Sequence, residues 1–207
     1  MVAATATLPM TKALAIPAMV APGKRYRIAL SGKAGSGKTT LAKRLVEDFG
    51  FARLSFAGAL KEELTSLLGL GLPEFEADKR KWRPLLQVWG SARRDVSEGY
   101  WVRKLLVRLP VNRGSPVVID DLRYENEAQA LKREGFYLVR LDCPSLDSIR
   151  YLRGQGMGIE EADVIRMHPS ETDLDGYDQF DLVLEAPRSR HLDTIYDELV
   201  GRIGWKA

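Results

Sequence analysis

The sequence predicts an α/β domain in which a central parallel sheet is flanked by helices on both faces. From Tyr26 onward, short apolar runs typical of strands alternate with longer segments whose apolar residues recur at helical spacing. A length of 207 residues with 45% hydrophobic residues provides for one core, and the balanced 29% of charged residues excludes a disordered chain. The single cysteine, Cys143, excludes disulfide scaffolds and multi-cysteine metal sites, and it favours a reducing cytoplasm.

Residues 1–24 are predicted to be an N-terminal extension, and residues 25–207 the domain. The extension is rich in Ala, Thr and Pro, and Lys12 and three prolines interrupt its apolar run, so it cannot span a bilayer. Lys12 lies inside the apolar stretch, whereas a secretory signal carries its positive charge before it. We therefore expect a cytoplasmic protein without a membrane partner.

The first half of the domain is predicted to contain two strands and four helices. The first helix has Leu41, Leu45 and Phe49 on one face and ends at Gly50, and the second has Leu60, Leu64 and Leu68 on one face. In order, we predict a strand at 26–31, a helix at 38–50, a strand at 53–56, a helix from about 60 to a turn region at 69–73, and helices at 84–95 and 98–109.

The second half is predicted to contain three strands at 116–120, 136–141 and 180–184, with a helix around Ala128 and Leu131 and a closing helix at 192–203. Between the last two strands, Gly154, Gly156 and Gly158 follow Arg150 and Arg153. This glycine-rich, basic stretch predicts a short mobile segment, which we call the lid candidate.

The segment Gly32–Thr39 fits the pattern G-x-x-x-x-G-K-[ST] directly after a predicted strand and at the start of a helix. In such a P-loop, backbone N–H groups and the helix N-terminus bind phosphate oxygens, Lys38 reaches the β- and γ-phosphates, and the Thr39 hydroxyl ligates Mg²⁺. The expected cofactors are ATP and Mg²⁺, held by Gly32, Ala34, Gly35, Ser36, Gly37, Lys38, Thr39 and Thr40.

Two acids, Asp120 and Asp121, end the strand at 116–120, where a P-loop site needs a second carboxylate for its metal. Either residue could instead be a helix N-cap, so one could cap a helix while the other serves the metal. Arginines are also frequent: Arg83, Arg93, Arg94, Arg123, Arg150 and Arg153. An acceptor that is itself a phosphate needs several cations, although any one arginine could also lie on a solvated helix face.

Four motifs then resemble those of the deoxynucleoside monophosphate kinases of bacteriophages, which belong to the P-loop nucleoside monophosphate kinase superfamily. They occur in the same order between Arg27 and Leu184: Ser55-Phe-Ala-Gly-Ala-Leu-Lys-Glu62; Leu86-Gln87 with Gly90-Ser91 and Arg94; Asp121-Leu-Arg-Tyr-Glu-Asn-Glu127; and His168-Pro-Ser-Glu171. The sequence departs from the family at Gly58-Ala59, where we expect Asp-Pro, and at Ser91-Ala92, where we expect Thr and an acid.

The resemblance implies a three-layer P-loop kinase fold, acceptor-binding helices at about 55–109 and a lid at about 150–171. It implies that Asp121 rather than Asp120 is the family's acid, and that Arg94 and Arg123 clamp the acceptor phosphate. The implied substrate-binding residues are Ser55, Lys61, Arg83, Gln87, Arg94, Arg123, His168 and Glu171. The expected catalytic residues are Lys38, Arg94, Arg123, Arg150 and Arg153.

The function expected from these motifs is ATP-dependent phosphorylation of a (deoxy)nucleoside monophosphate to its diphosphate, in nucleotide biosynthesis. The enzyme would act in the cytoplasm, that of the host if a phage encodes it, as a monomer or a homodimer and without a stable nucleic-acid partner. A phosphomevalonate-type kinase remains an alternative, because that family shares similar Ser-Gly-Pro-Leu-Lys and His-x-Ser-Glu patterns. A nucleic-acid-dependent P-loop NTPase is another, because eight basic and two acidic residues lie between Lys79 and Lys104. A nucleotide switch without transfer activity would need no arginine cluster.

Overall fold

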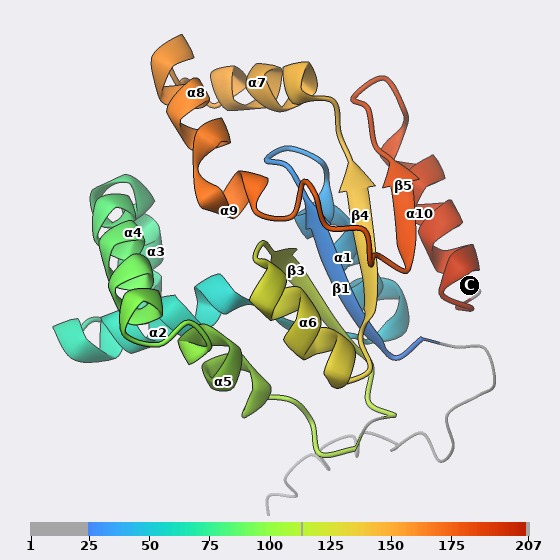
Figure 1. Cartoon of the computed structure of the whole chain (residues 1–207), viewed down its shortest axis with the longest axis horizontal. Coiled ribbons are helices and arrows are strands. Elements are labelled where there is room, and N and C mark those ends of the chain that lie inside the picture. Colours follow the sequence, from blue (N-terminus) through green and yellow to red (C-terminus); the bar gives the residue numbers. More distant parts are fainter. Residues whose placement is uncertain (1–24, 113, 206–207) are drawn as a thin grey trace, which may run out of the picture.

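Five parallel strands form one sheet in the order β2-β3-β1-β4-β5 (Figure 1). The computed structural model describes residues 25–112 and 114–205, without the side chains of Lys79, Arg80, Arg83, Glu161 and Arg166. The predicted extension at 1–24 therefore lies outside the described residues. The strands are β1 Arg27–Gly32, β2 Ala52–Leu54, β3 Val117–Leu122, β4 Tyr137–Asp142 and β5 Leu182–Glu185. Because all of them are parallel, their carboxyl ends meet at one edge of the sheet.

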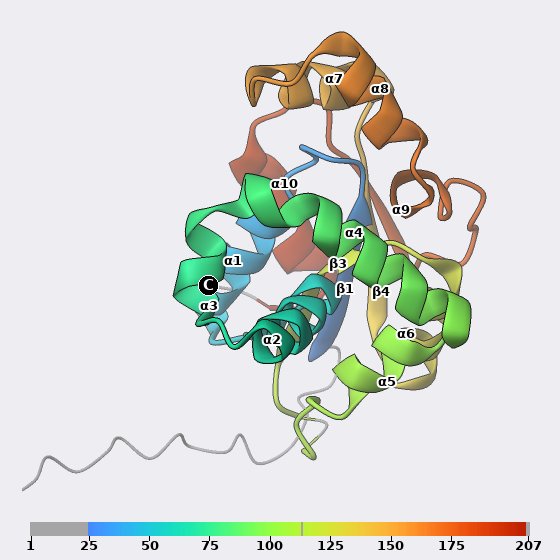
Figure 2. The same ribbon diagram turned by 90° about the vertical axis from the view of Figure 1, so that its left-hand side faces the viewer.

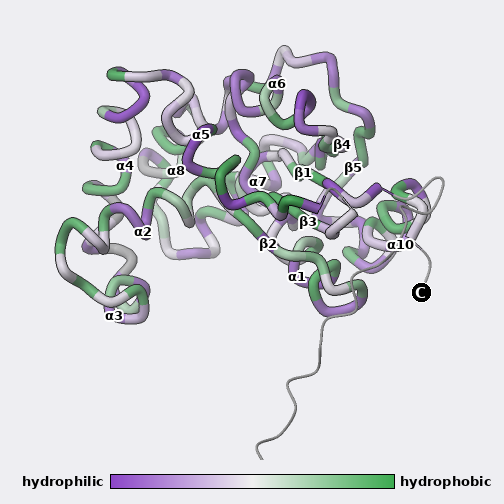
Figure 3. The backbone as a smooth tube through the Cα atoms, turned by 90° about the horizontal axis from the view of Figure 1, so that it is seen from below, coloured by the Kyte–Doolittle hydropathy of each residue, from purple (hydrophilic) through white to green (hydrophobic). Residues whose placement is uncertain are grey.

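Helices cover both faces of this sheet, as Figure 3 shows with α6 on one side and α1 and α10 on the other. The helices are α1 Lys38–Phe49, α2 Phe56–Leu68, α3 Leu72–Ala77, α4 Lys79–Val96, α5 Tyr100–Leu106, α6 Glu125–Arg133, α7 Ser145–Gly154, α8 Ile159–Met167, α9 Pro169–Thr172 and α10 Leu192–Arg202. In this described part of the chain, none has the length and the apolar run that crossing a bilayer requires.

Alternate residues of β1 pack into two separate hydrophobic cores. Ile28 and Leu30 are fully buried against α1 and α10, whereas Ala29 lies in a second core with residues of α2, α5 and α6. This alternation follows from the period of two along a strand. The predicted three-layer α/β fold is therefore confirmed.

The remaining helices lie near the carboxyl edge of the sheet. Helices α7, α8 and α9 lie above the strand ends, and α2, α3 and α4 form a group beside the sheet (Figures 1 and 2). These two groups correspond to the lid candidate and to the expected acceptor-binding helices.

Several element boundaries differ from the prediction. The helix expected to begin at Pro84 begins at Lys79, because the Asp78 side chain accepts a hydrogen bond from the Lys81 N–H (3.3 Å) and caps an earlier first turn. A short helix, α3, begins at Leu72, inside the turn region expected at 69–73. The glycine-rich stretch of the lid candidate, expected to be mobile, separates two helices, with Gly154 ending α7 and Gly158 preceding α8.

The two ends of the described fold meet at the opposite, amino-terminal edge of the sheet. The Arg25 N–H donates to the Ile203 carbonyl oxygen (2.8 Å), and the Trp205 indole N–H donates to the Arg25 carbonyl oxygen (2.8 Å). The Trp205 ring also packs against the rings of Tyr26, Phe49 and Phe51. This aromatic cluster closes the core under β1 and α10.

Candidate active site

The P-loop joins β1 to α1 at the carboxyl edge of the sheet. Gly37 is the N-cap residue of α1, with a φ of +94° that favours glycine and with no side-chain cap. The backbone N–H groups of the first turn of α1 are therefore left for an anion, as at other helix N-termini that bind phosphate.

Lys38 is buried within this loop. Its Nζ donates to the carbonyl oxygens of Gly32 (2.5 Å) and Lys33 (2.8 Å). Burial and the nearby Arg123 guanidinium lower the pKa of Lys38 to about 8. The side chain thus stays mostly protonated at neutral pH, and it lies within reach of the space above the loop.

A cavity of about 520 Å³ opens over the loop, with Gly35, Ser36, Gly37, Lys38, Thr39 and Thr40 along its wall. Gly32 and Ala34, the other two predicted loop residues, make contacts outside this wall. At Gly35, where φ is +79°, an added Cβ would lie 2.5 Å from the Tyr151 ring, so glycine allows α7 to approach.

The opposite wall of this cavity was not predicted. It consists of residues 186–192, which follow β5 and include Arg188, Arg190 and His191, together with Tyr151. The signal that could have found it is the position of this loop after a parallel strand, since ligands bind outside the carboxyl ends of such strands.

The two acids at the end of β3 have different surroundings. The carboxylate of Asp121 accepts hydrogen bonds from the N–H groups of Phe56 (3.0 Å) and Ala57 (2.8 Å) at the start of α2. Asp120 is 3% exposed and accepts one bond from Arg53 (2.7 Å). Its other oxygen, Oδ1, is buried and has no hydrogen-bond partner among the described residues. Asp120 therefore has an oxygen available for a ligand, whereas Asp121 is occupied in capping α2.

A second cavity, of about 330 Å³, lies between α2, α4 and the start of α6. Its apolar wall includes Phe56, Leu60, Leu86, Trp101 and Tyr124. Five of the predicted substrate-binding residues also line it: Lys61, Gln87, Arg94, Arg123 and His168. The structure thus brings together residues from four motifs that are far apart in the sequence.

Three other predicted substrate-binding residues are not on this wall. Ser55 caps α2, where its Oγ accepts a bond from the Gly58 N–H (2.9 Å). Glu171 turns toward the P-loop instead. Arg83 lies in α4, and its side chain is outside the description.

Arg94 is held beside the second cavity by Glu127, a residue to which the sequence assigned no role. The Arg94 guanidinium lies 3.5 Å from Glu127 Oε1 and 4.2 Å from the centre of the Tyr124 ring. Glu127 Oε2 also accepts the N–H groups of Arg123 (3.1 Å) and Tyr124 (3.2 Å). Burial raises the pKa of Glu127 to about 7, so this carboxyl can change its charge near neutral pH.

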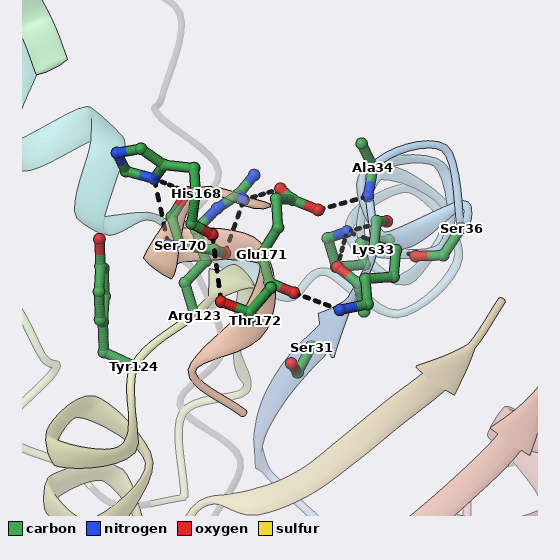
Figure 4. A network of polar contacts seen from close by, with 12 residues as sticks. Ser31, Lys33, Ala34, Ser36, Arg123, Tyr124, His168, Ser170, Glu171 and Thr172 are labelled. Atoms are coloured by element: carbon green, nitrogen blue, oxygen red, sulfur yellow. Dashed lines mark hydrogen bonds and ion pairs between the residues drawn. The ribbon is translucent and has the colours of Figure 1, made fainter. Parts of the chain in front are cut away.

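Helix α9 docks on the P-loop, as Figure 4 shows. The buried Glu171 carboxylate accepts a bond from the Ala34 N–H (2.9 Å) with Oε2 and pairs through Oε1 with Arg123. Lys33 donates to the Glu171 carbonyl oxygen (2.5 Å) and pairs with Asp175 (2.5 Å). His168 accepts the Ser170 N–H (3.2 Å) and so caps α9.

Arg150 and Arg153 are exposed on α7. Arg150 lies 3.3 Å from Asp147, and neither arginine belongs to the wall of the two cavities. A catalytic role for them requires α7 to move toward the phosphates.

The fold and the site together define the class: a P-loop kinase, with a nucleotide-binding loop and a second cavity that carries two arginines. The chain belongs to the AAA domain family, whose model matches residues 28–172. It is 29% identical over 204 residues, covering 84% of this chain and 93% of the relative, to a protein of Acanthamoeba polyphaga mimivirus provisionally named deoxynucleotide monophosphate kinase. The resemblance stated from the sequence motifs is thereby confirmed.

Solved structures support the same fold. The protein TT1252 of Thermus thermophilus superposes with a TM-score of 0.53 at 19% identity, over 87% of this chain and 96% of that one. A gluconokinase of Sinorhizobium meliloti superposes with a TM-score of 0.50 at 16% identity, over 87% and 94% of the two chains. At these identities the likeness concerns the fold alone.

Proposed function

We propose that this chain transfers the terminal phosphoryl group of ATP to the phosphate of a nucleoside monophosphate, with a deoxynucleotide as the acceptor, and so serves nucleotide biosynthesis. The observation that carries the proposal is the pair of cavities at the carboxyl edge of the sheet, one over the P-loop and one lined by Arg94 and Arg123. The name of the mimivirus relative supports the deoxynucleotide acceptor.

In this proposal the cavity over the P-loop binds the phosphate donor, and the second cavity binds the acceptor. Lys38 and the loop amides bind the donor phosphates, and Arg94 and Arg123 bind the acceptor phosphate. An ionised phosphate oxygen is already a nucleophile, so positioning and charge neutralisation suffice for the reaction. The apolar wall with Leu60, Leu86 and Tyr124 would hold the base. Residues 55–109 would then be the acceptor-binding part and residues 150–171 the lid of a domain that spans 25–207.

The residues present also fit Mg²⁺. The Thr39 hydroxyl and the unpartnered Oδ1 of Asp120 are the oxygen donors we assign to it, in preference to Asp121. Residues 25–112 and 114–205 contain no cluster of three His, Cys, Asp or Glu side chains that could hold a metal alone. This suits Mg²⁺, which keeps several waters and binds through substrate phosphates. When bound, the ion would neutralise charge on the phosphate oxygens.

The alternative of a nucleic-acid-dependent NTPase is less favoured, because three of the eight basic residues of the segment 79–104 are engaged in ion pairs. Arg93 (3.0 Å) and Lys104 (2.9 Å) both pair with Glu63, and Arg94 pairs with Glu127. A track for a phosphate backbone needs free cations. A cytoplasmic location and a homodimer stay predictions from the sequence.

The test is a coupled assay with ATP and Mg²⁺ across the common ribo- and deoxyribonucleoside monophosphates, with phosphomevalonate as a further acceptor. We expect at least one nucleoside diphosphate as product. Lys38→Ala should lower turnover about 10²- to 10³-fold while the fold survives, because it removes a cation from the transferred group. Lys43→Ala, at an exposed lysine of α1, is the matched control. Turnover of phosphomevalonate alone, or an undiminished Lys38→Ala enzyme, would contradict the proposal.

A further inference from the structure

The Glu171 carboxylate makes two contacts that the proposed function assigns to phosphates. Its Oε2 accepts the N–H of Ala34, which belongs to the phosphate loop, and its Oε1 pairs with Arg123, which we assign to the acceptor phosphate. A carboxylate and a phosphate edge each present two anionic oxygens to such donors. In Figure 4 the Glu171 side chain reaches from α9 to the loop, between these two partners.

This contact also supplies negative charge where cations converge. Lys33, Lys38 and Arg140 lie around the same loop, with side-chain exposures of 15% for Lys33 and 14% for Arg140. Glu171 itself is only 5% exposed at its side chain, in direct contact with Arg123. Buried cations without counter-charge destabilise a fold, and because Asp175 pairs with Lys33 and Arg140, Glu171 supplies the negative charge beside Arg123 and Lys38.

The rest of α9 is anchored independently of this carboxylate. Lys33 donates to the backbone carbonyl oxygen of Glu171 and pairs with Asp175, and Asp175 also pairs with Arg140 (2.9 Å). The Glu171 side chain can therefore turn away from Ala34 and Arg123 while α9 stays docked.

We propose that Glu171 is a positioning residue that takes the place of a phosphate in the ligand-free enzyme, keeping the Ala34 N–H and Arg123 in their binding arrangement until a nucleotide phosphate displaces it. The inference rests on the proposed function in that the loop and Arg123 bind phosphate. It differs from the role expected from the sequence, in which Glu171 contacts the acceptor.

The test measures binding of metal-free inorganic pyrophosphate by calorimetry, together with melting temperatures. Glu171→Gln keeps the size of the side chain but removes the competing charge. Pyrophosphate should bind this variant about tenfold more tightly than the unaltered enzyme, since one charge-assisted contact no longer has to be displaced. The ligand-free variant should melt at a lower temperature, and pyrophosphate should restore it. Glu47→Gln, at an exposed glutamate of α1, is the control and should change neither value.

The sign of the binding change is decisive, because a merely structural role would weaken pyrophosphate binding along with stability. Equal or weaker binding by Glu171→Gln would overturn the inference. If that variant does not fold, Glu171→Asp replaces it in the test. Its side chain keeps the charge but is too short to reach both partners, so pyrophosphate should again bind more tightly, by a smaller factor. Tighter pyrophosphate binding without any kinase activity would overturn only the proposed function, and an absence of pyrophosphate binding by every protein would overturn both.

Discussion

Asp120 and Asp121 are adjacent in the sequence, but their carboxylates have different surroundings. Asp121 caps α2, and Asp120 keeps a buried oxygen without a partner among the described residues. We therefore expect Asp120→Asn to raise the Mg²⁺ requirement about 10- to 100-fold. Asp121→Asn should instead lower stability by about 0.5–2 kcal/mol, as the loss of a helix cap does. Magnesium titrations of the initial rate and thermal unfolding measure the two effects.

This expectation reverses the order implied by the family resemblance, which favoured Asp121. The position at the end of a strand identified the pair and the family register favoured Asp121, but neither could show which carboxylate α2 would occupy. If Asp121→Asn raises the Mg²⁺ requirement more than Asp120→Asn, the structural assignment is wrong.

Glu127 should make stability depend on pH. Its pKa is about 7 in the fold, against an ordinary 4.5, through burial and the Asp121 carboxylate, opposed by Arg94. A raised carboxyl pKa contributes stability that is fully present below pH 4.5 and is lost as the pH rises through 7, about 3 kcal/mol in all. Glu127→Gln should remove this dependence of stability on pH. The difference between the unfolding free energies of the two proteins, measured in urea, should therefore change between pH 4.5 and 7.

The matched control is Glu125→Gln, at an exposed position of the same helix. Its unfolding free energy should follow that of the unaltered protein at every pH. Parallel curves for the unaltered protein and Glu127→Gln would show that Glu127 has an ordinary pKa.

Residues of the site could be predicted where their signal is local. The P-loop is a continuous motif, so its cavity residues were found from the sequence. Tyr151, Arg188 and Glu127 were missed as site residues because their contacts join segments far apart in the chain. Glu171 was predicted to contact the acceptor, and in the structure its carboxylate contacts Ala34 and Arg123, because Lys33 holds α9 against the P-loop.

At the scale of elements, Glu63 joins α2, α4 and α5. Its carboxylate accepts bonds from Trp89 (3.1 Å), Arg93 (3.0 Å) and Tyr100 (2.5 Å), and it pairs with Lys104. Although burial opposes it, hydrogen bonds from Tyr100, Lys104 and Trp89 lower the pKa of Glu63 to about 2. These three helices carry most of the second cavity.

Glu63→Gln should therefore destabilise the protein by about 1–3 kcal/mol and raise the KM for the monophosphate more than that for ATP. The depressed pKa means that this stability is present above pH 4.5 and is lost as the pH falls toward 2. Glu62→Gln is the control, because the Glu62 carboxylate pairs with Arg108 at an exposed position. An equal rise in both KM values would separate Glu63 from the acceptor side.

The prediction of elements succeeded for the strands and failed at particular helix boundaries. Strands at the sheet centre are continuous apolar runs, whose pattern survives any tertiary context. Pro84 suggested a helix start, but the side chain of Asp78 supplies an earlier cap. The glycines at 154–158 predicted a short mobile segment, and they separate two helices, α7 and α8, that the sequence did not predict.

At the scale of the whole molecule, α7 and α8 should close over the site while α9 stays docked on the P-loop. Arg150 and Arg153 are exposed here, and closure would bring them toward the phosphates and exclude water. Hydrogen exchange at residues 145–172 should slow on binding of a bisubstrate analogue, with α10 as the internal reference. An unchanged exchange rate in this region would remove the lid proposal.

The layers of the molecule were predictable, but the strand order was not. Alternating strands and helices imply a parallel sheet with covered faces. The order β2-β3-β1-β4-β5 depends on pairings between distant strands, such as Ala52 beside Val117, for which the sequence offers no local signal.

Because Arg25 contacts Ile203 and Trp205, the two ends of the described fold lie side by side. A short linker could join residue 205 to residue 25, and new ends could be opened in the connection between α5 and β3, whose described residues line neither cavity. In such a circular permutant, the new ends cut neither the P-loop nor any segment that lines a cavity. The order in which the elements leave the ribosome can thus be changed without rebuilding the catalytic edge of the sheet.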